Sequence, residues 1–154
     1  MSDFRRFRIL FLCTGNSCRS QMAEGWARAL HPRLLDPCSA GTQPKGVDPR
    51  AVRAMAEAGV DISGQTSKAV AACDPDTLDL VVTVCDAAAE ACPASVGRAR
   101  ALRQSFDDPP RLAAGAASDD EAMGHYRRVR DEIRAFIETL PQLLPGERDR
   151  ERWA

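Results

Sequence analysis

The sequence predicts an α/β fold with a central parallel sheet, on the strength of two observations. Short apolar runs that are typical of buried strands alternate with helix-like segments along the 154 residues. The runs at residues 7–13 and 78–85 are almost continuously apolar, as expected of parallel strands covered on both faces. Each of these runs ends in a cysteine. Cys13 and Cys85 are therefore expected on the same rim of the sheet, where α/β proteins place their ligand sites.

Composition is that of one ordinary globular domain. Hydrophobic residues make up 44% and charged residues 28% of the chain, and the net charge of −1 directs it to neither nucleic acid nor an anionic membrane. No apolar run approaches the roughly 20 residues of a membrane span, and no apolar signal segment precedes Phe7. We expect a cytoplasmic protein with a single catalytic domain over 1–145 and a charged, flexible tail over 146–154. A disulfide framework among the six cysteines is not expected in that compartment.

The elements in the first half of the chain are delimited by their end signals. A helix over 20–31 follows Cys13, with Ser20 as its N-cap and Pro32 as its stop. Residues 33–40 are predicted to form a second strand, followed by a loop over 41–46. Asp48 and Pro49 are typical of a helix start, and that helix is expected to end at a glycine, Gly59.

The second half alternates in the same way. A short helix is predicted over 67–73, the strand 78–85 follows it, and the composition of 86–92 favours a helix. A weak strand is expected within 99–106, a rigid turn at 107–110 and a flexible loop at 113–118. Apolar residues at helical spacing predict a long amphipathic helix over 119–140.

The eight residues Cys13–Ser20 carry the clearest chemistry. A turn between a strand and a helix directs backbone N–H groups and the positive end of the helix dipole at one point, which suits an anion. The guanidinium of Arg19 matches two oxygens of a tetrahedral oxyanion. Gly15 and Asn16 are expected to supply the positive φ angles that the curl needs. The predicted oxyanion loop comprises Thr14, Gly15, Asn16, Ser17, Cys18 and Arg19.

The same surroundings are expected to favour the thiolate form of Cys13. Arg19, the helix N-terminus and the loop N–H groups all stabilise a negative sulfur. The hydroxyl of Ser20 is expected to donate a further hydrogen bond to it. We therefore predict that the loop binds a tetrahedral oxyanion and that Cys13 attacks it. A nucleotide-binding P-loop is not supported, because the sequence has no Gly-x4-Gly-Lys-Ser/Thr.

Two related families resemble this chain over roughly residues 7–140. Cys13-x5-Arg19-Ser20 with a late Asp108-Pro109 looks like the low-molecular-weight tyrosine phosphatase fold. The longer match, Cys-Thr-Gly-Asn-Ser-Cys-Arg-Ser-Gln-Met-Ala-Glu-Gly-Trp over 13–26 together with the pair Cys85 and Cys92, resembles the thioredoxin-coupled arsenate reductases. The resemblance implies a three-layer architecture in which a four-stranded parallel sheet is flanked by helices.

The resemblance to the reductases also implies a relay of three thiols. Cys13 would attack arsenic, Cys85 would attack Cys13 and release arsenite, and Cys92 would leave a Cys85–Cys92 disulfide for thioredoxin to reduce. Electron counting agrees, since reducing arsenate to arsenite takes two electrons and a dithiol supplies two. In a continuous helix residues 85 and 92 lie about 10 Å apart along the axis, whereas a disulfide needs Cα atoms within about 7 Å. We expect the 85–92 segment to be helical when reduced and looped when oxidised.

Asp108 is the predicted general acid, for the hydroxide that leaves arsenate. Its neighbour Asp107 is a rival on sequence grounds, and the family position of the Asp-Pro pair favours Asp108. Tyrosine phosphatases of this fold resemble one another in carrying aromatic residues just after this pair. This chain has Pro110, Arg111 and Leu112 there, so no aromatic side chain is available to stack on an aryl substrate.

A cation site is implied by the resemblance and altered in this chain. Some arsenate reductases bind potassium through residues that match Asn16, Glu24 and Thr66, together with an aspartate. Here Lys68 stands in place of that aspartate. We expect its ammonium to replace the ion and to pair with Glu24, so that no metal is bound.

The sequence therefore predicts an arsenate reductase that serves arsenic detoxification. The expected partners are arsenate and thioredoxin, with no cofactor, nucleic acid or membrane. Two alternatives stay open: a phosphatase acting on a tyrosine or small phosphoester, and an oxyanion-sensing module built on the same loop.

Overall fold

The computed structural model describes residues 5–85 and 99–144, which form a four-stranded sheet with helices packed against it. The strands are β1 (Phe7–Cys13), β2 (Leu35–Gly41), β3 (Leu80–Thr83) and β4 (Arg100–Arg103). They pair in the order β2-β1-β3-β4, and all three pairings are parallel. The predicted fold class is confirmed.

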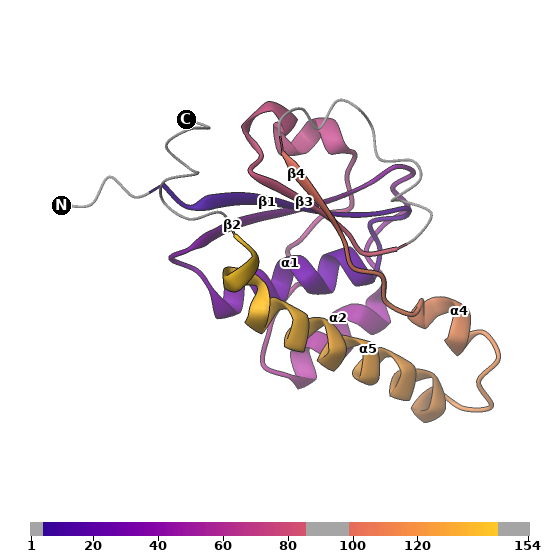
Figure 1. Cartoon of the computed structure of the whole chain (residues 1–154). Helices are drawn as coiled ribbons and strands as arrows, with labels where there is room; N and C mark the ends of the chain where they lie inside the picture. The colour runs from indigo at the N-terminus through magenta and orange to yellow at the C-terminus, as the bar shows by residue number, and fades with distance from the viewer. Residues whose placement is uncertain (1–4, 86–98, 145–154) are drawn as a thin grey trace.

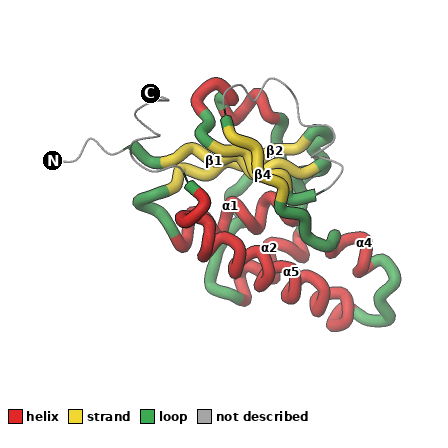
Figure 2. The backbone as a smooth tube through the Cα atoms, in the orientation of Figure 1, coloured by secondary structure: helices red, strands yellow, loops and turns green. Residues whose placement is uncertain are grey.

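Three helices pack together on one side of the sheet, α1 (Arg19–Leu30), α2 (Pro49–Glu57) and α5 (Asp119–Thr139) (Figure 1). Two 3-10 helices, η1 (Val70–Cys73) and η2 (Pro75–Thr77), lie on the other side (Figure 2). The short helix α4 (Pro109–Ala113) precedes α5, and the 3-10 helix η4 (Leu140–Leu143) follows it. Because β1 is central and covered on both faces, Ile9, Leu10, Phe11 and Leu12 are fully buried.

Most predicted boundaries agree with the structure, and the differences have local causes. Helix α2 starts as expected, with the Asp48 carboxylate accepting from the Arg50 N–H at 2.9 Å, and Gly59 follows its end at φ +85°. Helix α1 starts one residue before its predicted N-cap, so Cys18 and not Ser20 precedes the helix. The predicted turn at 107–110 leads directly into α4, because Pro109 suits the first position of a helix.

Two expectations fall at or beyond the edge of what is described. Strand β3 ends at Thr83, so Cys85 follows the strand instead of closing it. The helix predicted over 86–92, with Cys92, and the tail over 146–154 lie outside the described residues. Among the helices that the structure does describe, none has the length and apolarity needed to cross a membrane.

Candidate active site

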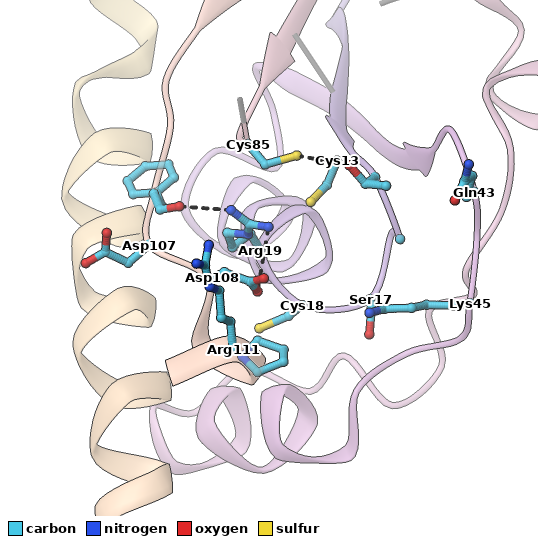
Figure 3. A pocket seen from close by; sticks show the side chains of 14 residues that line it. Cys13, Ser17, Cys18, Arg19, Gln43, Lys45, Cys85, Asp107, Asp108 and Arg111 are labelled. Atoms are coloured by element: carbon cyan, nitrogen blue, oxygen red, sulfur yellow. Dashed lines mark hydrogen bonds and ion pairs between the residues drawn. The ribbon is translucent and has the colours of Figure 1, made fainter. Parts of the chain in front are cut away.

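A cavity of about 560 Å³ opens at the carboxyl ends of β1 and β3, where the sequence places Cys13 and Cys85 (Figure 3). Its walls come from the oxyanion loop, from the segment after β2 and from the residues that lead into α4. The lining residues are Cys13, Thr14, Gly15, Ser17, Cys18, Arg19, Gln43, Lys45, Cys85, Phe106, Asp107, Asp108, Pro110 and Arg111. Four of the six predicted catalytic residues thus line one cavity, and Cys92 lies outside the described residues.

Asn16 gives the oxyanion loop its curl. Its φ of +46° lies in the left-handed region, and the residue is fully buried. Its side-chain amide holds this conformation, since Nδ2 donates to Ser20 Oγ at 2.9 Å and Oδ1 accepts the Lys68 N–H at 2.9 Å. Gly15 was expected to have positive φ and does not. A Cβ there would lie 2.7 Å from Cε of Lys45, so the flexible Lys45 side chain would have to shift.

Ser20 supports the loop and not the sulfur. Its buried hydroxyl accepts a hydrogen bond from the Asn16 side-chain amide. The expected hydrogen bond from Ser20 to Cys13 is not found within the part of the chain that the structure describes. Ser20 is therefore a positioning residue that acts through Asn16.

Arg19 projects from the start of α1 to the far wall of the cavity. Its Nη1 donates to the Phe106 carbonyl at 2.9 Å, and its Nη2 lies 3.6 Å from the Asp108 carboxylate. Asp107 turns the other way and pairs with Arg128 of α5 at 3.1 Å. Figure 3 shows Asp108 beside Arg19 and Asp107 directed away from the loop. Of the two neighbours that the sequence left as rivals, Asp108 is the one that faces Arg19, although both line the cavity.

Cys13 and Cys85 are buried side by side at the base of the cavity, each 4% exposed. The Cys85 sulfur lies 3.6 Å from the Thr14 hydroxyl (Figure 3). A hydrogen bond with Cys85 also acts on the Cys13 thiol. That hydrogen bond and burial raise the pKa of Cys13, against the opposing charge of Arg19 and the Thr14 backbone N–H. The direction of this pKa shift is opposite to the expected preference for the thiolate, and its causes are the contact with Cys85 and burial.

This contact leads to a testable prediction for the Cys85→Ala variant. Removing the largest contribution that raises the pKa of Cys13 lowers that pKa, so Cys13 should react at lower pH. The measurement is the rate of iodoacetamide labelling at Cys13 as a function of pH, followed by mass spectrometry. Labelling of the buried Cys18 in the same samples reports any general loosening. An unchanged profile at Cys13 would contradict the prediction.

The residues matched to a potassium site lie together behind the loop. Glu24 is 4% exposed, and Arg28 Nη2 reaches its carboxylate at 2.8 Å. The Lys68 ammonium lies 3.6 Å from the other oxygen of Glu24 and donates to the Thr66 carbonyl at 3.1 Å. The backbone of Lys68 also holds the Asn16 side chain. Two cations thus face the buried carboxylate, and one of them is Lys68, as expected.

A disulfide joins Cys38 of β2 to Cys73 of η1. This corrects the expectation that the six cysteines form no disulfide framework. The two positions are 35 residues apart, and only the pairing of β2 with η1 in space brings them within reach. Sequence spacing alone does not indicate such a pair.

Gln43 and Lys45 are cavity residues that sequence reasoning missed. They follow β2, and the Lys45 N–H donates to the Gly15 carbonyl at 3.0 Å. Lys45 extends across the mouth of the cavity toward Ser17 (Figure 3). The rule that parallel strands present their carboxyl ends to the ligand applies to β2 as well, and it was the available signal.

Sequence comparison shows which known proteins this chain resembles. The model of the low molecular weight phosphotyrosine protein phosphatase family matches residues 8–149. An arsenate reductase of Halalkalibacterium halodurans is 47% identical over 137 residues, covering 87% of this chain and 94% of that protein. An arsenate reductase of Bacillus subtilis is 44% identical over 135 residues, covering 85% of this chain and 95% of that protein.

Solved structures agree in fold. An arsenate reductase in its phosphate-binding state superposes with a TM-score of 0.73 at 30% identity, over 90% of this chain and 99% of that one. A tyrosine phosphatase of Erwinia amylovora superposes with a TM-score of 0.72 at 19% identity, over 95% of this chain and 98% of that one. At that identity the phosphatase supports the shared fold alone.

Proposed function

The chain belongs to the low-molecular-weight phosphotyrosine protein phosphatase family, and within this family we propose that it is an arsenate reductase. The observation that carries the proposal is the second thiol, Cys85, buried against Cys13 in the anion cavity. Hydrolysis of a phosphoester needs one nucleophile and one acid, and it has no use for a second thiol. Reduction of arsenate needs two electrons, which a pair of thiols provides. The similarity to curated arsenate reductases supports the same choice.

The first step binds arsenate and forms a bond between sulfur and arsenic. The loop N–H groups and the guanidinium of Arg19 hold the oxyanion over Cys13. Cys13 attacks arsenic as the thiolate, and a hydroxide departs with a proton from Asp108. Because the contact with Cys85 and burial raise the pKa of Cys13, the thiol loses its proton as it attacks, and that proton passes to an oxygen of the bound arsenate.

The second step transfers the electrons. Cys85 attacks the Cys13 sulfur, the bond between sulfur and arsenic breaks, and its electron pair leaves with arsenite. Arsenic(V) thereby becomes arsenic(III), and two thiols become the Cys13–Cys85 disulfide. Cys92 then attacks Cys85 and restores Cys13, which leaves a Cys85–Cys92 disulfide for an external dithiol. We propose a thioredoxin as that dithiol and the cytoplasm as the compartment.

Thiol counting over a single turnover tests the proposal. Reduced protein is mixed with arsenate without reductant, and thiols and arsenite are measured together. A reductase loses two thiols for each arsenite formed. A phosphatase loses none, and an oxyanion-binding module forms no arsenite. Comparing turnover supported by thioredoxin with turnover supported by glutathione and a glutaredoxin then identifies the donor.

Phosphatase activity is the second candidate, favoured by the approach of Asp108 to Arg19 at 3.6 Å. The loop, its nucleophile and an acid are sufficient parts for hydrolysis of a small phosphoester. The wall after the acid lacks an aromatic ring, and Leu112 there is 38% exposed. We propose weak hydrolysis of small phosphoesters and poor discrimination in favour of aryl ones.

The pairing of Lys68 with Glu24 leads to a prediction about potassium. Because an ammonium already faces the carboxylate, potassium should change turnover and thermal stability little compared with sodium. The Lys68→Asp variant should gain a saturable potassium response, since it replaces a resident cation with a ligand for one. Turnover and melting temperature are measured over matched potassium and sodium series. A strong potassium effect on the wild-type protein that sodium does not reproduce would refute the assignment.

A further inference from the structure

The Cys38–Cys73 disulfide lies behind the oxyanion loop, outside the proposed relay. We propose that it is a redox switch that sets how tightly the loop binds its anion. The disulfide joins the middle of β2 to the end of the segment 63–73. That segment supplies the backbone group that holds Asn16 in its left-handed conformation. The inference rests on the proposed function only in that the loop binds a tetrahedral oxyanion.

The segment is attached to the site through its backbone. The Lys68 N–H donates to Asn16 Oδ1 at 2.9 Å, and the Ser67 hydroxyl donates to the Gly15 carbonyl at 3.2 Å. On its other side the Lys68 carbonyl accepts from the Gly41 N–H at 2.8 Å, beside a parallel bridge between Gly41 and Ala69. The segment therefore lies between the end of β2 and the loop and touches both.

Close packing at Gly41 makes the oxyanion loop sensitive to small shifts of the segment 63–73. A Cβ at Gly41 would lie 2.6 Å from the Thr14 carbonyl oxygen and 2.9 Å from the Asn16 nitrogen. The loop backbone thus rests directly on the end of β2. A shift of the neighbouring segment by a fraction of an ångström lengthens the Lys68–Asn16 hydrogen bond, which opposes the cost of a left-handed residue.

At its far end the segment is held by the disulfide, by Val70, which packs against the core, and by a hydrogen bond from Arg8 Nη1 to the Cys73 carbonyl at 3.2 Å. None of residues 63–72 is buried, whereas Cys73 is 1% exposed. Segments with few buried apolar contacts open locally at low free-energy cost. A covalent link from Cys73 to β2 removes much of that freedom. Breaking the link leaves the segment held by its hydrogen bonds, by the half-buried Val70 and by one buried thiol.

The chemistry of the switch is thiol–disulfide exchange with an external dithiol. Cys38 is partly exposed and is the sulfur that a reductant reaches first. A thiolate of the reductant attacks Cys38, the bond to Cys73 breaks, and Cys73 leaves as a thiolate that takes up a proton. The second thiol of the reductant then releases Cys38, so two electrons and two protons enter this pair. A disulfide of the same class reverses the change.

Phosphate binding to a Cys85→Ser/Cys92→Ser protein tests the switch, because the proposed relay cannot operate there. The protein purified without reductant is compared with the same protein after treatment with dithiothreitol and its removal. We expect phosphate to bind about five- to tenfold more weakly after reduction, within the usual range of coupling between two sites. Amide hydrogen exchange at Lys68 and Gly41 should become faster in the reduced protein.

A matched control adds Cys38→Ser and Cys73→Ser to the same background. Its phosphate affinity should equal that of the reduced protein and should not respond to dithiothreitol. Peptide mapping that finds no Cys38–Cys73 link after disulfide treatment overturns the inference. Equal phosphate affinity in the two redox states overturns it too, even where arsenite formation by the wild-type protein upholds the proposed function. If phosphate affinity differs between the two redox states but the wild-type protein forms no arsenite, the switch is upheld and the proposed function is wrong.

Discussion

Cys85→Ser should abolish arsenite formation while phosphate still binds. A hydroxyl of nearly the same size retains the hydrogen-bonding position beside Thr14 and keeps the cavity filled. It cannot form a disulfide with Cys13, so the covalent adduct has no route to arsenite. The measurements are arsenite formed per protein over one turnover and phosphate affinity by calorimetry. Loss of phosphate binding would mean that the variant disturbs the loop itself.

The same variant separates reduction from hydrolysis. Cys13, Arg19 and Asp108 are intact in it, so any hydrolysis of a small phosphoester should survive. The Cys92→Ser variant is expected to differ from Cys85→Ser. It should release one arsenite per protein and then stop, with Cys13 and Cys85 linked by a disulfide. Sustained cycling of either variant with thioredoxin would show that the relay is wrong.

Local patterns were enough to predict the framework of the site. A buried apolar strand, a turn with a cysteine and an arginine, and a helix read in order already place β1, the loop and α1 together. The end signals Asp48, Pro49 and Gly59 mark α2 because each acts within one turn of the chain. The N-cap of α1 was misplaced by two residues, since Ser20 has the residue type of a cap but is used to hold Asn16.

Features that depend on contacts between distant segments could not be predicted from local sequence patterns. The pKa of Cys13 is raised because Cys85 lies against it and because the thiol is buried, and the two cysteines are brought together by the pairing of β1 with β3. The Cys38–Cys73 disulfide depends on the packing of η1 on β2. The different directions of Asp108 and Asp107 depend on Arg128, which belongs to a helix later in the chain.

Asp108→Asn should slow the first chemical step by about 10²- to 10⁴-fold, the usual contribution of a general acid. An asparagine keeps the shape of the side chain and a hydrogen bond to Arg19, but it has no proton for the departing hydroxide. The step is followed as the rate of arsenite appearance in a single turnover, so that thioredoxin does not limit it. Phosphate affinity should change little by comparison, because the acid acts in the transition state.

Asp107→Asn is the matched control, one position away and of the same chemistry. It loses an exposed ion pair with Arg128, which contributes about 0–1 kcal/mol to stability. Its single-turnover rate should therefore stay near that of the wild-type protein. Equal slowing of the two variants would mean that the effect comes from α4 and the turn before it. Slowing by Asp107→Asn alone would reverse the assignment, and the acid would then have to reach the cavity by turning away from Arg128.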